Sequence, residues 1–195
     1  INLFSYVENP FTDKAEFNFE LFKKHIIIAQ RMMDDIIDLE LEKIDGILAK
    51  IDADPEMEDV KATEKNLWLN IRHKAYEGRR TGIGITAEGD MLAALGIRYG
   101  SEEGTEFSTK VHKTLAIETY RASVDLAKER GVFSIFDAER EKNNPFIMYV
   151  PNDFIDYCFV FCTFNISKIT EGSFSFFSLR SSFLVSLSLS IITVW

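Results

Sequence analysis

Cysteine is scarce in this chain, with only Cys158 and Cys162 among its 195 residues. Two cysteines are too few for the disulfide framework of a small secreted protein, so we expect a reducing, cytoplasmic setting. Both lie in the apolar run of residues 157–162, and thiols in apolar surroundings are unreactive. We therefore do not predict that these two cysteines form a redox-active pair.

Positive charge is also in short supply. The chain has 22 Lys and Arg against 31 Asp and Glu, which gives a formal net charge of -9. A nucleic-acid-binding surface needs clustered Lys and Arg to replace the counterions of the phosphates, so we expect no nucleic-acid binding. A site for free nucleotides needs only a few local charges, and that possibility stays open.

An initiating methionine, a basic leader and a long apolar run are missing as well. The chain opens with Ile1-Asn2-Leu3-Phe4, so we expect it to begin inside a longer reading frame. Its most apolar stretch, residues 181–195, is shorter than the roughly 20 residues that a membrane span needs. A membrane partner is therefore not the favoured interpretation.

Four stretches carry apolar residues at the spacing of amphipathic helices. Gly78 follows the third stretch (residues 60–77) and Gly131 follows the fourth (residues 103–130), and each glycine is expected to be a C-cap. Because each buried Ile or Phe contributes about 1.5–3 kcal/mol, the first stretch is predicted to be a main source of stability. Residues 1–7 are expected to be a strand end or an extended lead-in. The four predicted helices are residues 17–38, 41–51, 60–77 and 103–130.

The stretch of residues 79–107 holds the strongest local signals. Residues 82–86 alternate glycine with β-branched residues, which predicts a short strand whose backbone is approached closely by another group. Asp90 is then expected to cap a short apolar helix, and Gly96 to end that helix in the left-handed conformation.

The order of residues in this stretch also resembles a known family. Residues 82–103 (GIGITAEGDMLAALGIRYGSEE), residues 126–133 (LAKERGVF) and residues 32–45 (MMDDIIDLELEKID) resemble the large, catalytic chain of ribonucleotide reductases, most of all the adenosylcobalamin-dependent class. The resemblance runs from Ile1 to about Ile147. It implies a mainly α fragment of an α/β protein, with helices and one or two strands of a ten-stranded α/β barrel.

The resemblance implies an activity for the parent protein. Such a reductase converts ribonucleotides to deoxyribonucleotides through a thiyl radical that adenosylcobalamin generates, with a thiol reductant such as thioredoxin, and a homodimer is compatible with it. The family's radical-bearing cysteine, in an Asn-x-Cys-x-Glu setting, would lie before Ile1, and its reducing cysteines and phosphate loop lie in other segments. We therefore assign no catalytic residue, no cofactor ligand and no metal ligand in this chain, and predict that the fragment alone is inactive.

One motif indicates a different function, and it consists of Asp34, Asp35 and Asp38. Asp34 and Asp38 are one helical turn apart, and carboxylates so placed can hold Mg²⁺. Isoprenoid synthases use such a DDxxD run on a helical fold, so a Mg²⁺-dependent prenyl-transfer enzyme is an alternative function. The favoured interpretation is a solvated helix face, because helix faces carry acids routinely and no second aspartate-rich helix is present.

Other glycines and arginines give weaker signals. The spacing of Gly82, Gly84 and Gly89 fits neither the dinucleotide fingerprint nor a P-loop. Arg79 and Arg80 could meet a phosphate, but we expect them to cap a helix C-terminus or make surface ion pairs.

The three histidines give no metal signal. His25, His73 and His112 are scattered along the chain, and we predict that none pairs with a Glu or His at ligand spacing.

The tail differs in composition from the rest of the chain. It is rich in Phe and Ser and poor in charge, so we divide the chain into a partial barrel domain, residues 1–147, and a divergent tail, residues 148–195. The favoured interpretation is that this tail is foreign to the family, for example through a frameshift. A non-enzymatic helical module tethered to a membrane by the tail is the third functional hypothesis.

Overall fold

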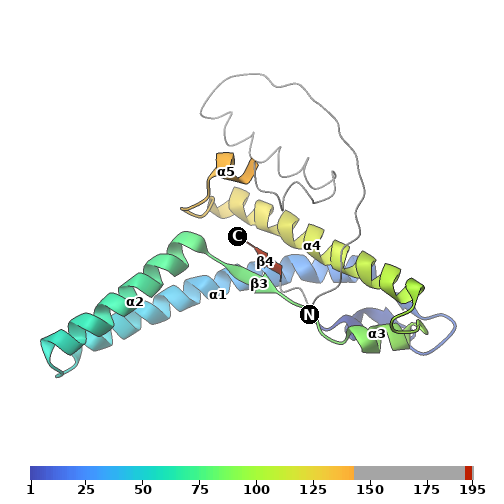
Figure 1. Ribbon diagram of the computed structural model, residues 1–195, viewed down its shortest axis with the longest axis horizontal. Coiled ribbons are helices and arrows are strands. Elements are labelled where there is room, and N and C mark those ends of the chain that lie inside the picture. Colours follow the sequence, from blue (N-terminus) through green and yellow to red (C-terminus); the bar gives the residue numbers. More distant parts are fainter. Residues whose placement is uncertain (143–191, 195) are drawn as a thin grey trace, which may run out of the picture. The chain divides into compact units, whose positions relative to one another are not determined.

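The computed structural model describes residues 1–142 and 192–194. They belong to two compact units, Ile1–Phe136 with Ile192–Trp195, and Asp137–Ile191, and each unit is considered by itself. The elements in chain order (Figure 1) are η1 (Leu3–Tyr6), β1 (Val7–Glu8), β2 (Glu16–Phe17), α1 (Phe19–Ala53), α2 (Glu58–Gly78), β3 (Thr81–Ile83), α3 (Glu88–Ala94), α4 (Glu102–Arg130), α5 (Ala138–Lys142) and β4 (Ile192–Val194).

The described residues are mostly helical, as the mainly α prediction requires. Their strands form two sheets of two strands each, with β1 beside β2 and β3 beside β4, both pairs antiparallel. A ten-stranded barrel is not seen in this part of the chain. The predicted boundary between residues 147 and 148 lies outside the described residues and stays a prediction.

Helix α1 is the longest element and organises the first unit. It begins at Asn18, whose side-chain oxygen accepts the N–H of Leu21 at 2.9 Å, and runs for 35 residues. Two separate helices were predicted here, and that break is wrong because Leu39, Glu40 and Leu41 are good helix formers that interrupt nothing. One face of α1 is buried throughout, at Phe22, Ile26, Gln30, Ile37, Ile44 and Ile51.

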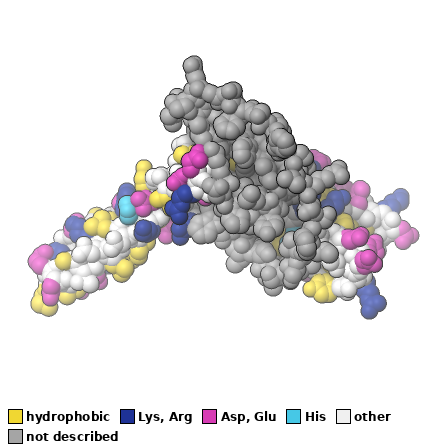
Figure 2. All heavy atoms as spheres, turned by 45° about the horizontal axis from the view of Figure 1, so that its top comes forward, with side chains coloured by type: hydrophobic (Ala, Val, Ile, Leu, Met, Phe, Trp, Pro, Cys, Tyr) yellow, Lys and Arg dark blue, Asp and Glu magenta, His cyan; other side chains and the backbone are white. Residues whose placement is uncertain are grey.

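Helix α2 returns along α1 in the opposite direction. Lys65 pairs with Asp52 at 2.7 Å, and Arg72 pairs with Asp45 at 2.6 Å. As the residue number rises along α2, the partner on α1 therefore lies nearer the start of α1. The two helices form a hairpin, and exposed apolar side chains lie among charged ones along it (Figure 2).

Helix α4 runs beside α1 in the same direction (Figure 1). Near the start of both helices Phe107 lies 6.0 Å from Phe19 between ring centroids, and near the end of α4 Glu129 pairs with Arg31. Ser101 caps α4, and its side-chain oxygen accepts the N–H of Gly104 at 3.1 Å. The C-cap of α4 is Gly131 with φ of 88°, also as predicted.

The core lies where the chain start, α3 and the amino-terminal halves of α1 and α4 meet. Tyr6, Phe17 and Phe22 form an aromatic cluster there, with ring centroids 5.0–5.9 Å apart. The first predicted stretch contributes Phe17, Phe22 and Ile26 to this core. The members of this core cluster with 2% exposure or less are Leu3, Phe22, Ile26, Met91, Leu92, Val111 and Leu115.

Some local predictions are corrected. Residues 3–6 form η1 instead of a strand, because the Asn2 side chain accepts the N–H of Phe4 and starts a 3-10 turn. Helix α3 begins earlier than predicted, at Glu88 after the N-cap Ala87, so Asp90 lies within its first turn instead of at the cap. Gly96 follows α3 with φ of 76°, which confirms its left-handed conformation.

Candidate functional site

The chain start pairs with the segment that follows β3. Asn2 and Thr86 form a parallel bridge, in which Leu3 N–H donates to Thr86 O at 3.0 Å and Thr86 N–H donates to Ile1 O at 2.9 Å. The amino group of Ile1 also donates to Gly84 O at 2.7 Å. Parallel pairing of two segments that are joined through helices is the unit from which α/β sheets and barrels are built.

The strand segment from Thr81 to Thr86 has one buried face. Thr81 and Ile83 are 6% and 4% exposed, whereas Gly84 and Thr86 are exposed. The close approach predicted at this strand is not seen at Gly84, where an added Cβ would meet nothing within 4 Å in the described part of the chain.

Gln30 of α1 fastens the buried face of β3 to the helix. Its side-chain Nε2 donates to Thr81 Oγ1 at 3.4 Å, and both residues are buried. Among the residues that the structure describes, none provides a hydrogen-bond partner for Gln30 Oε1. The hydrogen bond from Gln30 attaches β3 to α1, whereas the unpaired Oε1 lowers the stability of the folded state, because an unsatisfied buried acceptor costs free energy.

Arg79 joins the end of α2 to α1. It is the C-cap of α2, with φ of 40° and ψ of 45°, and so takes the left-handed position that the sequence assigned to Gly78. Its guanidinium donates to Asp34 Oδ1 at 2.8 Å, to Asp38 Oδ1 at 2.7 Å and to the Asp34 carbonyl at 3.0 Å. The prediction that Arg79 caps a helix end and makes ion pairs is confirmed.

Arg130, the last residue of α4, binds the same acids from the other side. It donates to Asp34 Oδ2 at 2.5 Å and to Asp35 Oδ1 at 2.7 Å. The hydrogen bond from Arg79 lowers the pKa of Asp38, and the hydrogen bond to Asp35 raises the pKa of Arg130. We call these five side chains, Asp34, Asp35, Asp38, Arg79 and Arg130, the ion-pair cluster.

The ion-pair cluster explains the DDxxD motif. One oxygen of each of the three carboxylates lies within 4.8 Å of the others, a spacing that a metal could use. Two guanidinium groups already occupy that position with positive charge, and they also anchor α2 and α4 to α1. Asp34 is only 14% exposed at its side chain, so it is not part of a solvated helix face as the sequence suggested. The geometry gives no support to a Mg²⁺-dependent prenyl-transfer site.

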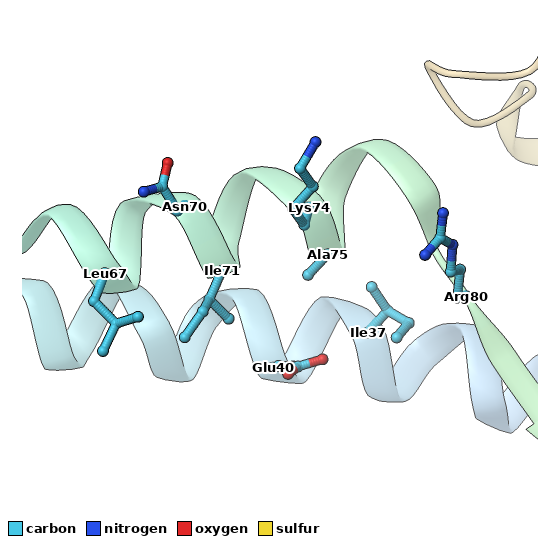
Figure 3. Close-up of a pocket in the computed structure, with 8 residues that line it drawn as sticks. All are labelled: Ile37, Glu40, Leu67, Asn70, Ile71, Lys74, Ala75 and Arg80. Carbon is cyan, nitrogen blue, oxygen red and sulfur yellow. The ribbon is translucent and has the colours of Figure 1, made fainter.

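A shallow groove of about 430 Å³ lies between α1 and α2 (Figure 3). In the close-up, Leu67 and Ile71 of α2 point toward α1, while the polar ends of Lys74 and Arg80 point away from the apolar floor. The groove is lined by Ile37, Glu40, Leu67, Asn70, Ile71, Lys74, Ala75 and Arg80.

Two histidines pair with glutamates, contrary to the prediction. His73 Nε2 lies 3.1 Å from Glu77 one turn along α2, and His112 Nε2 lies 3.3 Å from Glu88. Each pair offers two ligands from different residues, and in the described residues neither belongs to a larger group of potential metal ligands. The third, His25, lies 3.1 Å from the hydroxyl of Tyr6 through its Nδ1.

Comparison with known proteins identifies the family. The model of the family described as "Ribonucleotide reductase, barrel domain" matches residues 1–171 of this chain. The chain belongs to the ribonucleotide reductase family. The match passes the boundary at residue 147 that we expect from composition, and the described residues leave that boundary untested.

Curated reductases agree with this assignment. A "Vitamin B12-dependent ribonucleoside-diphosphate reductase" of Mycobacterium tuberculosis is 29% identical over 59% of this chain and 16% of its own length. The alpha subunit of the ribonucleoside-diphosphate reductase of Chlamydia pneumoniae is 30% identical over 80% of this chain and 12% of its own length. A "Vitamin B12-dependent ribonucleoside-diphosphate reductase" of Thermoplasma acidophilum is 30% identical over 73% of this chain and 15% of its own length.

The chain spans only a small part of the curated relatives that it matches, between 12% and 16% of the length of these three. No solved structure matches it. Among the described residues, no helix is long and apolar enough to cross a membrane.

The groove between α1 and α2 does not fit adenosylcobalamin. It is shallow, apolar and polar residues line it in equal number, and none of the three histidines is among them. We therefore derive no reaction step through this cofactor from the side chains of this segment.

Two features of the site were not found by reading the sequence. The bridge between Asn2 and Thr86 joins residues far apart in the chain, and nothing in the local sequence marks it. The pairing of Arg130 with Asp34 likewise depends on how α4 lies on α1. The contact between His73 and Glu77 could have been found, because a spacing of four residues places both on one helix face.

Proposed function

We propose that this chain is a bracing segment of a ribonucleotide reductase that converts ribonucleotides to deoxyribonucleotides by thiyl-radical chemistry. The observation that carries the proposal is the family match over residues 1–171. The parallel bridge between Asn2 and Thr86 supports it, because a barrel domain needs parallel strands joined through helices.

In this proposal the side chains of the segment position the barrel and do not react. The ion-pair cluster fixes the ends of α2 and α4 on α1, and Gln30 fixes the start of β3. The reacting cysteines and the loop that grips the substrate phosphates belong to other parts of the parent protein. The isolated 195-residue chain is therefore inactive.

The curated relatives suggest the chemistry of the parent. Because the relatives above are named ribonucleoside-diphosphate reductases, we propose a ribonucleoside diphosphate as substrate. Because two of them are named vitamin B12-dependent, we propose adenosylcobalamin as the cofactor. A thiol reductant such as thioredoxin, a homodimeric assembly and a cytoplasmic location complete the proposal.

A turnover assay on two proteins tests the proposal. The full-length parent and the 195-residue chain are each incubated with CDP, adenosylcobalamin and a dithiol, and deoxynucleotide is measured by chromatography. We expect product from the parent, no product when adenosylcobalamin is left out, and none from the 195-residue chain. A folded parent that forms no deoxynucleotide would overturn the proposed activity, and product from the short chain would overturn its assignment as an inactive brace.

A further inference from the structure

We propose that the groove between α1 and α2 binds the same groove of a second copy of this chain, so that two helical hairpins form a four-helix bundle. The two hairpins lie parallel, with α1 of each copy on α2 of its partner. This assigns a specific surface to the proposed homodimer. The inference rests on the side chains of the hairpin and does not require the proposed reaction.

Helix α2 leaves its apolar side chains uncovered. Of its 21 residues only Gly78 is buried, whereas Val60, Leu67 and Ile71 are exposed, Leu67 at 57%. The spacing of these three residues places them on one face of the helix. Because most of the stability of a helix in water comes from the packing of its apolar face, we infer that α2 packs against a further partner besides α1.

Helix α1 adds apolar side chains to the same groove. Ile37 lines the groove together with Leu67 and Ile71 (Figure 3). Ile36 is 48% exposed and lies four residues before Glu40, on the same face of α1 as that groove residue. Apolar side chains on one face of two neighbouring helices are what a four-helix bundle buries in its core.

The two sides of the groove carry opposite charges. Glu40 lies on the α1 side and Lys74 on the α2 side. Among the residues that the structure describes, Glu40 has no ion pair, and Lys74 reaches Glu77 only at 4.0 Å with its side chain 82% exposed. Both charges are therefore available to a partner.

Glu40 and Lys74 also lie at a similar height along the hairpin. Arg72 pairs with Asp45, so Lys74 lies level with residue 43 of the antiparallel α1. Glu40 is about 4.5 Å from that level along the helix axis, at 1.5 Å per residue. The side chains of Glu40 and Lys74 are long enough to span this offset.

The charges decide between two symmetric arrangements of the hairpins. With a twofold axis that runs across the hairpins, α1 lies on α1 of the partner, and the acidic side of one groove faces the acidic side of the other. With the axis parallel to the hairpins, α1 lies on α2 of the partner, and Glu40 of each copy faces Lys74 of the other. Opposite charges favour the second arrangement, and the patch is then self-complementary, as a twofold interface requires.

Sedimentation velocity on the 195-residue chain at about 1–100 μM tests the inference. We expect a dimer whose fraction rises with concentration. Leu67→Glu places a charge in the interface of both copies and should raise the dissociation constant of the dimer by about tenfold or more. Leu69→Glu is the matched control, because Leu69 is 44% exposed but lies on another face of α2; it should change the constant by less than about twofold.

Charge reversal tests the arrangement. Glu40→Lys and Lys74→Glu should each raise the dissociation constant by about threefold to tenfold, because like charges then face each other. The double variant restores opposite charges and should dimerise within about twofold of the unaltered chain. Circular dichroism checks that every variant keeps its helices.

Three results would each overturn the inference. A chain that stays monomeric would show that a different partner covers this face of the hairpin. Equal effects of Leu67→Glu and Leu69→Glu would place the contact elsewhere on the chain. A double variant as weak as the single ones would refute the pairing of Glu40 with Lys74. A parent without reductase activity would leave all of these results unchanged, so the two proposals fail separately.

Discussion

Replacing Arg79 should destabilise the fold more than replacing Arg72, which forms an exposed ion pair in the same helical hairpin. Arg79→Met removes the guanidinium that bonds Asp34 and Asp38. The side chain of Asp34 is 14% exposed and that of Asp38 is 53% exposed. A hydrogen bond between charged groups is worth about 1.5–3 kcal/mol when partly buried and about 0.2–1 kcal/mol at the surface. We therefore expect a loss of about 2–4 kcal/mol in the free energy of unfolding.

The backbone of Arg79 makes the prediction more specific. Its φ of 40° is in the left-handed region, which costs a side-chain-bearing residue roughly 1–2 kcal/mol and costs glycine little. Arg79→Gly loses the same hydrogen bonds but relieves that strain. It should therefore be less destabilising than Arg79→Met by about 1 kcal/mol, although glycine removes more atoms.

Urea unfolding followed by circular dichroism measures both variants, with the free energy extrapolated linearly to water. Arg72→Met is the matched control, because Arg72 forms an exposed pair with Asp45, with side chains 38% and 53% exposed. It should cost clearly less than Arg79→Met, because solvent screens an exposed pair. The reasoning is refuted if Arg79→Met costs no more than Arg72→Met, or if Arg79→Gly is the more damaging of the two substitutions at that position.

Three further predictions follow from the same structure. The hydrogen bond from Arg79 lowers the pKa of Asp38. The ionised Asp38 therefore stabilises the fold fully above about pH 4, the value of an unfolded carboxyl group, and this stabilisation is lost as pH falls through the lower folded pKa. In Asp38→Asn, the urea midpoint should fall less steeply with acid than in the unaltered chain. Gly104→Ala should lower the unfolding midpoint because its Cβ would lie 2.8 Å from the backbone oxygen of Arg98, whereas Gly46→Ala, with nothing within 4 Å, should stabilise α1 by about 0.5–1 kcal/mol. Millimolar Mg²⁺ should leave the thermal midpoint unchanged because Arg79 and Arg130 already pair with all three aspartates, and a midpoint that rises with Mg²⁺ would contradict this.

Features encoded by neighbouring residues were predictable from the sequence. Gly131 is the C-cap of α4, as its place directly after the predicted helix indicates, because the positive φ of 88° that ends the helix favours glycine. Gly96 behaves as predicted for the same reason. The sequence predicts the C-cap of α2 at Gly78, but the structure has it at Arg79. The local sequence does not show this, because the aspartates that hold Arg79 in its left-handed conformation belong to another helix.

Features encoded by distant residues were not predictable in this way. Asn2 and Thr86 come together only because the α1–α2 hairpin brings the chain back to its start, so no local sequence pattern predicts their bridge. The three aspartates were correctly placed on one helix, but their partners could not be identified, because Arg130 reaches them from the far end of α4. Family resemblance supplied the barrel assignment that spacing alone did not.

The α1–α2 hairpin has a practical consequence for experiments on the parent enzyme. Beyond the ion-pair cluster, the ion pairs of α1 at Asp45 and Asp52 go to α2, and Met57 at the tip is 71% exposed. The short connection after Asp54 thus lies at the end of a two-helix arm. An epitope or a fluorescent label inserted there is expected to be tolerated, because exposed loop tips accept insertions.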